Sequence, residues 1–143
     1  MITLDEKTGR LFYDEDSIPS KFDGIGQTVG KNIYSNFKVK TKTVDGKQCD
    51  VIAYYKNAKL DNISIFLDND YLKDNYTPPS DIDFRDYLSP YIEYSINELK
   101  AVIKSFLNSK KTNFSWGRIE TLTDPRDQVP FIKITYLSAA TFS

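Results

Sequence analysis

One amphipathic helix among strand-like segments is the feature that most constrains how this chain can fold. Within residues 90–109, apolar side chains recur at spacings of four, three, four and three residues. These positions are Ile92, Ile96, Leu99, Ile103 and Phe106. An α-helix turns once in about 3.6 residues, so the five side chains form one continuous stripe. A helix with one apolar stripe needs a second layer to cover, and the rest of the chain should supply a sheet.

Alternation of apolar and polar residues predicts strands on both sides of this helix. The clearest example is residues 37–43, where lysines alternate with Phe37, Val39 and threonines. Asp45-Gly46 follows and is typical of a tight hairpin turn, because such turns need positive φ angles. We expect an opening hairpin within residues 2–14 and strands over residues 37–43, 47–55, 62–68, 114–122 and 130–137.

Together these segments predict an α+β fold with a mainly antiparallel sheet of about six or seven strands and one principal helix packed on one face. The 143 residues are the size of one ordinary domain, so we expect a single globular domain over residues 1–143, with 138–143 as a loose tail. The sequence has no apolar run of membrane-spanning length and its start does not resemble a signal peptide, so we expect a cytoplasmic protein.

The residue types that are missing exclude several kinds of chemistry. The chain has no histidine and a single cysteine, Cys49. Histidine-based triads, histidine acid–base catalysis and Cys/His zinc sites are therefore impossible. An enzyme would have to use carboxylates, lysine, tyrosine or a metal held by oxygen, so we expect a non-enzymatic protein without a cofactor. Cys49 lies in an expected strand and is interpreted as a small core residue.

The net charge of −1 conceals an uneven distribution. Residues 31–59 hold seven lysines against two aspartates, a net of +5, whereas residues 60–99 hold nine acidic residues against Lys73 and Arg85, a net of −7. The ordinary interpretation of the Lys38, Lys40 and Lys42 row is the solvent side of a strand. Arginine is scarce there and the total charge is near neutral, so we expect neither nucleic acid nor a membrane as partner.

The acidic segment also carries tyrosines, a combination that suits a protein interface. The predicted partner-binding residues are Asp68, Asp70, Tyr71, Asp74, Tyr76, Asp81, Asp83 and Asp86. The alternative interpretation of this acidic segment is a solvated loop whose carboxylates cap helices. The start "DNDYLKDNYTPP" resembles a calcium loop, but Leu72, Lys73 and Pro79 stand where a ligand, glycine and glutamate are needed. We therefore expect no metal site.

Trp116-Gly117, within the last expected hairpin, allows two interpretations. Trp116 is the only tryptophan, and an interior strand glycine often marks a β-bulge. We expect a packing anchor at a bulge; the alternative is a tryptophan exposed at an interface.

The order of these motifs resembles bacterial immunity proteins, which protect cells from polymorphic or contact-dependent growth inhibition toxins. The opening hairpin carries Gly9, Leu11 and Tyr13, followed by Ile18-Pro19. An acidic aromatic segment then leads into one long helix. The chain closes on a pattern made of Phe114, Trp116, Gly117, Ile119, Asp124-Pro125, Ile132, Ile134 and Tyr136.

This resemblance implies a non-catalytic protein that binds and neutralises a cognate toxin domain in the cytoplasm. Many such toxins are nucleases with basic channels, which an acidic surface would complement. Two other interpretations stay open: a different interaction module, such as a secretion chaperone or adaptor, and a small-ligand-binding α+β domain. The sequence names neither the toxin nor the oligomeric state, and it leaves open whether the lysine row and the acidic segment pair with each other.

Overall fold

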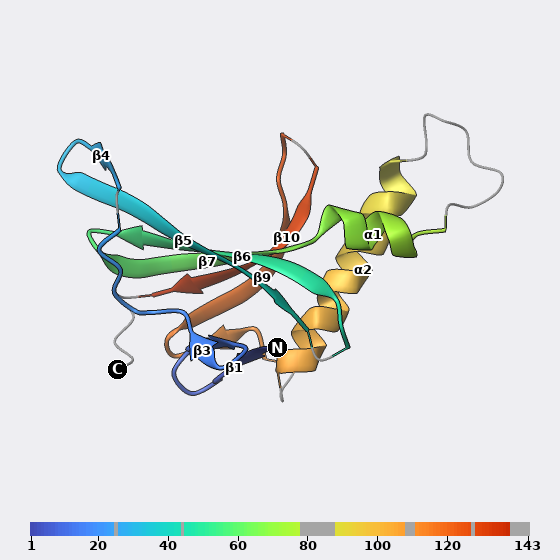
Figure 1. The fold of residues 1–143 in the computed structure, drawn as a ribbon, viewed down its shortest axis with the longest axis horizontal. Coiled ribbons are helices and arrows are strands. Elements are labelled where there is room, and N and C mark those ends of the chain that lie inside the picture. Colours follow the sequence, from blue (N-terminus) through green and yellow to red (C-terminus); the bar gives the residue numbers. More distant parts are fainter. Residues whose placement is uncertain (25, 44, 78–87, 108–110, 127, 138–143) are drawn as a thin grey trace.

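The computed structural model describes residues 1–24, 26–43, 45–77, 88–107, 111–126 and 128–137. It confirms the α+β fold: a seven-stranded antiparallel sheet, a separate three-stranded sheet and one main helix packed on the large sheet. Figure 1 shows the β4–β5 hairpin extending away from both helices, which lie at the opposite end of the large sheet.

The large sheet has the order β4-β5-β6-β7-β10-β9-β8. Its strands are β4 (Gln27–Val29), β5 (Asn32–Lys42), β6 (Gln48–Lys56), β7 (Lys59–Leu67), β10 (Pro130–Tyr136), β9 (Gly117–Thr123) and β8 (Asn113–Phe114). The opening hairpin does not join this sheet. With a third short strand it forms the small sheet, made of β1 (Ile2–Leu4), β2 (Leu11–Tyr13) and β3 (Asp16–Ser17).

The two faces of the large sheet differ in what covers them. Alternate residues of β6, β7 and β10 point to one side, which we call the inner face, and are almost fully buried. They are Val51, Ala53, Tyr55, Ile63, Ile65, Ile132, Ile134 and Tyr136. The helix α2 and apolar side chains of the small sheet complete this core. The opposite side, the outer face, carries the intervening residues.

The main helix, α2 (Leu88–Phe106), confirms the helix expected over 90–109 and begins two residues earlier. Its most buried positions are Ser95, Leu99, Val102 and Phe106, whereas the isoleucines of the predicted stripe are half-buried. The buried face is thus turned slightly from the apolar stripe. Ser95 can lie there because its hydroxyl donates to the Tyr91 carbonyl at 2.9 Å, which satisfies a polar group removed from water.

The Trp116-Gly117 pair has a different geometry from the one expected. Ser115 and Trp116 form the turn between β8 and β9, and Gly117 pairs in register with both Phe114 and Tyr136. The predicted bulge at Gly117 is therefore wrong. Within the described part of the large sheet, a register shift occurs instead where β6 pairs with β7, between Tyr54 and Tyr55. Glycine is needed at 117 because a Cβ would lie 1.9 Å from the Thr135 carbonyl oxygen.

Trp116 joins the two sheets, as the packing interpretation predicts. Its ring stacks on Phe114 with centroids 5.0 Å apart, and its indole nitrogen donates to the Glu6 carbonyl at 2.7 Å. Gly9 of the β1–β2 turn lies directly against the ring, with a positive φ of 81°. The hydroxyl of Tyr136 donates to the Gly9 carbonyl at 2.7 Å. The contacts of Trp116 and Tyr136 thus hold the β1–β2 hairpin against the last hairpin of the large sheet.

Cys49 is a core residue, only 2% exposed. Burial raises the pKa of its thiol to about 12, and the charge of Asp50 adds to this. Because the thiolate is the reactive form, we expect no modification of the native protein by a thiol reagent at neutral pH and one modified thiol per chain after denaturation. Ellman's reagent with and without denaturant measures this, and rapid modification of the native chain would contradict it.

Candidate partner-binding surfaces

The acidic segment forms a short helix that the sequence did not predict, α1 (Asn69–Asn75). Asp68 caps it, with its carboxylate accepting from the Asp70 amide at 2.8 Å. This bond satisfies one of the amides that lack an intrahelical partner at a helix start. Asp70 and Asp74 are exposed. Asp81, Asp83 and Asp86, also predicted partner-binding residues, lie outside the described residues.

The two predicted tyrosines of this segment are half-buried against α2. Tyr76 packs edge-on against Tyr91 at 5.2 Å and tilted against Tyr94 at 5.1 Å between ring centroids. The hydroxyl of Tyr71 donates to the Glu98 carboxylate at 3.4 Å. Burial and the neighbouring Glu98 charge raise the pKa of Tyr71. Among the described members of the predicted set, the exposed residues are therefore Asp70 and Asp74, at the surface of α1.

The basic and acidic segments meet through one buried lysine. The ammonium of Lys47 lies 3.0 Å from the Glu98 carboxylate and 3.6 Å from Asp45. Burial by itself lowers the pKa of Lys47, but the hydrogen bond and charge of Glu98, helped by Asp45, raise it above the ordinary value. Within the described residues, Glu98 is the member of the acidic segment that forms an ion pair.

The lysine row is exposed, as the alternation predicts. Lys38, Lys40 and Lys42 all point to the outer face, and the residues between them are half-buried or buried. Lys40 lies 3.8 Å from Asp50 on the neighbouring strand, a long contact between exposed groups that adds little stability. Among the described residues, the ion pair that joins the basic and acidic segments is therefore made by Lys47 and not by this row.

The outer face is the larger candidate surface, and the sequence did not predict it. Three rows of side chains cross its five central strands. One row is Lys38, Ile52, Ser64, Lys133 and Glu120; the next is Asn36, Tyr54, Asn62, Thr135 and Arg118. The third holds Lys40, Asp50, Phe66, Phe131 and Leu122, with Phe66 and Phe131 stacked at 5.2 Å. In the described part of the chain, no helix packs on these rows.

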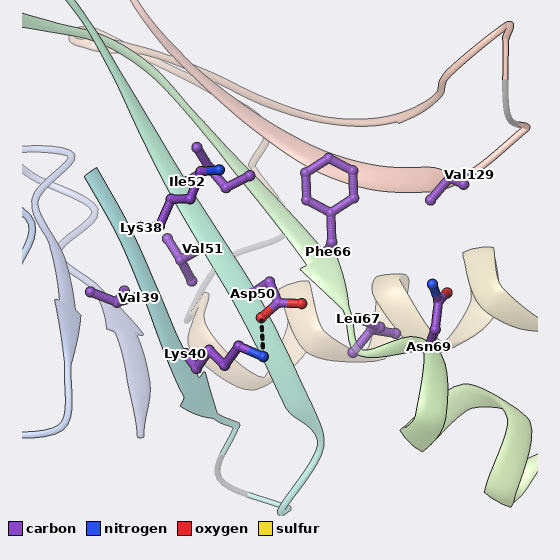
Figure 2. Close-up of a pocket in the computed structure, with 10 residues that line it drawn as sticks. All are labelled: Lys38, Val39, Lys40, Asp50, Val51, Ile52, Phe66, Leu67, Asn69 and Val129. Carbon is purple, nitrogen blue, oxygen red and sulfur yellow. Dashed lines mark ion pairs between the residues drawn. The ribbon is translucent and has the colours of Figure 1, made fainter. Parts of the chain in front are cut away.

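A hollow of about 530 Å³ lies at one end of this face, and we call it the first hollow. Figure 2 shows Lys38, Lys40 and their strand neighbours on one side and Phe66, Asn69 and Val129 on the other. Asn69 is the first residue of α1, so the acidic helix begins at the border of this hollow. The lysine-bearing face and the acidic helix are thus contiguous surfaces of opposite charge.

A second hollow, of about 380 Å³, occupies the other end of the outer face. Tyr34, Tyr54, Phe131 and Lys133 line it. Tyr34 is 42% and Tyr54 37% exposed, and Val29 and Leu137 are exposed at the same end of the sheet. Large apolar side chains gathered in this way on a surface mark an interaction site more often than isolated ones do.

The sequence did contain a signal for this face. In the "VIAYY" part of β6 both sets of alternating positions are apolar or aromatic, and β7 adds Phe66 to the outer set beside Asn62 and Ser64. Strands of this kind are typical of sheets covered on both sides. Among the described residues one long amphipathic helix packs on the sheet, and it covers the inner face.

No protein-family model, curated protein or solved structure matches this chain. Neither described helix has an apolar stretch long enough to cross a membrane. Among the residues that the structure describes, no group of three or more cysteine, aspartate and glutamate side chains is arranged to hold a metal ion.

Proposed function

We propose that this chain is a non-catalytic immunity protein, which binds and neutralises a bacterial toxin domain. The observation that carries the proposal is the outer face, on which neither described helix packs and where aromatic, aliphatic and lysine side chains lie together over five strands. Aromatic residues with a charged surround are typical of protein interfaces. The motif order that resembles immunity proteins supplies the toxin as the kind of partner.

The acidic surface of α1 is the second part of the proposed interface. Asn69, the first residue of α1, lines the first hollow, and the exposed Asp70 and Asp74 follow it in the same helix. We therefore expect a partner seated on the outer face to meet these carboxylates at its rim. Exposed charges at a rim mainly raise the association rate. A basic toxin region, such as a nuclease channel, would complement these carboxylates.

Neutralising this acidic rim should weaken binding moderately. For the double variant Asp70→Asn/Asp74→Asn we expect the association rate to fall about threefold to tenfold at low salt, with little change in the dissociation rate. Surface plasmon resonance against the captured partner measures both rates. A rate equal to that of the unaltered chain would show that α1 does not face the partner.

The proposed function is tested by capture followed by a growth assay. The tagged chain is used to isolate partners from a lysate of the source organism, and each partner is then expressed in a test bacterium with and without this chain. We expect one stoichiometric partner that stops growth alone and is harmless in the presence of the chain. A partner that is harmless alone would favour the chaperone or adaptor alternative, and recovery of a small molecule would favour a ligand-binding domain.

A further inference from the structure

The charges of the outer face are not balanced. Its rows contain two carboxylates, and both have basic neighbours: Asp50 has Lys40, and Glu120 has the Arg118 guanidinium at 2.6 Å. Lys38 and Lys133 lie in the same row as Glu120, and Lys133 stands directly opposite Glu120. Among the described residues, neither lysine has an ion-pair partner. The uncompensated charge at the centre of this face is therefore positive.

The apolar residues of the outer face lie around these two lysines. Ile52 stands between Lys38 and Ser64 in the same row, and the stacked Phe66 and Phe131 lie in the next. The two hollows lie toward opposite ends of the face, with Lys38 lining the first and Lys133 the second. A partner must therefore offer negative charge at the centre and apolar side chains toward both ends.

The size of the face suits a protein rather than a small molecule. Five strands about 4.8 Å apart, and six residue steps of about 3.4 Å from Tyr34 to Lys40, give roughly 24 Å by 20 Å. Because the side chains make the surface uneven, the accessible area of this face is larger than that rectangle. It approaches the area of about 800 Å² that one partner contributes to a standard interface. Each hollow alone would seat only a few side chains.

From these observations we propose that the outer face docks an acidic patch of the partner protein that also carries apolar or aromatic side chains. This rests on the proposed function and identifies which part of the toxin is held. The carboxylates of α1 lie next to the positively charged centre of the outer face. Because the two regions have opposite charge, together they fix the orientation of the bound partner. A nucleic acid fits less well, because Asp50 and Glu120 lie within the rows that its phosphates would have to cross.

The test compares two charge-reversal variants of the full chain. Lys38→Glu/Lys133→Glu alters the outer face, and Lys7→Glu/Lys100→Glu is the matched control with the same change in charge at exposed positions elsewhere. Titration calorimetry with the captured partner should show a loss of affinity of at least about tenfold for the first variant and less than about twofold for the second. The outer-face variant should also protect a test bacterium from the toxin less well than the control variant does.

A second arm does not require the natural partner. Labelled short peptides of alternating glutamate and leucine, or lysine and leucine, and an oligothymidylate are titrated while backbone amide signals are followed by NMR. We expect the glutamate peptide to bind and to shift amides of β5, β6, β7 and β10, and the Lys38→Glu/Lys133→Glu variant to lose this binding. Equal binding of the lysine peptide, preference for the oligothymidylate, shifts confined to α1 and α2, or no saturable binding would each overturn the proposal.

The two arms separate this inference from the proposed function. A toxic partner that is bound and neutralised equally by both variants would leave the immunity function standing and overturn the outer face as its site. A glutamate peptide that maps to the outer face, with no toxic partner captured, would support the docking surface and contradict the immunity function.

Discussion

Replacing Gly117 with alanine should destabilise the protein by about 3 kcal/mol or more, because added atoms in a tightly packed site force the backbone to move. The new Cβ would lie 1.9 Å from the Thr135 carbonyl oxygen and 3.1 Å from the Tyr136 Cα, both backbone atoms that a change of rotamer cannot clear. β9 would have to separate from β10, and Trp116 would then lose its contacts with Phe114 and Gly9. Urea denaturation measures the change in the free energy of unfolding.

The matched control for Gly117→Ala is Gly30→Ala, in the turn between β4 and β5. Gly30 has a φ of 62°, and a Cβ there would have no neighbour within 4 Å. The expected cost is therefore only that of a left-handed backbone, about 1–2 kcal/mol. Trp116, the only tryptophan, reports the difference: its emission should shift to the red in native Gly117→Ala and stay unchanged in Gly30→Ala. A Gly117 variant no less stable than the Gly30 variant would contradict the close-contact explanation.

Most of the fold can be predicted from the periodicity of the sequence, and the errors in that prediction have local causes. The β5–β6 hairpin and the main helix are confirmed because alternation and helical spacing report directly on which side is buried. The tight turn expected at Asp45-Gly46 is wrong in detail: β5 ends at Lys42, β6 begins at Gln48, and Gly46 has a positive φ whereas Asp45 does not. The opening hairpin is also confirmed as β1 and β2. The short strands β3 and β4 and the β8–β9 turn were missed, because two- and three-residue strands carry too few positions to show a period. The close approach of Thr135 to Gly117 is a contact between strands, and a single strand's pattern cannot contain it.

The candidate site shows a different limit of sequence reasoning. Counting charges by segment found the acidic and basic regions, but it could not show that Tyr71 and Tyr76 turn toward α2, nor that Asp68 is used as a helix cap. Those roles depend on how α1 and α2 pack. The outer face combines residues from five strands, so its charge balance becomes visible only once the strand register is known.

Removing the Lys47 ammonium should cost about 2–3 kcal/mol in the variant Lys47→Met. Breaking a buried ion pair costs about 3–5 kcal/mol, and we reduce this because the Glu98 side chain is 24% exposed. The methionine preserves much of the packed stem, so the loss reflects a carboxylate left without its partner. Because the pKa of Lys47 is raised in the folded protein, its charged form contributes fully to the free energy of unfolding at neutral pH. This contribution is lost only as the pH rises through about 10.4 and beyond.

Two further variants separate the ion pair from packing. Lys40→Met removes a lysine that is 84% exposed and 3.8 Å from Asp50, so we expect a change within about 0.5 kcal/mol. Lys47→Met/Glu98→Leu removes both charges and should recover much of the lost stability, since an apolar pair no longer contains an unpaired carboxylate. If Lys47→Met unfolded no more easily than Lys40→Met, the pair would not hold α2 against the β5–β6 turn. The placement of α1 beside the outer face would then depend on other contacts, such as the packing of Tyr71, Leu72 and Tyr76 and the hydrogen bond from the Asp68 amide to the Gln48 carbonyl.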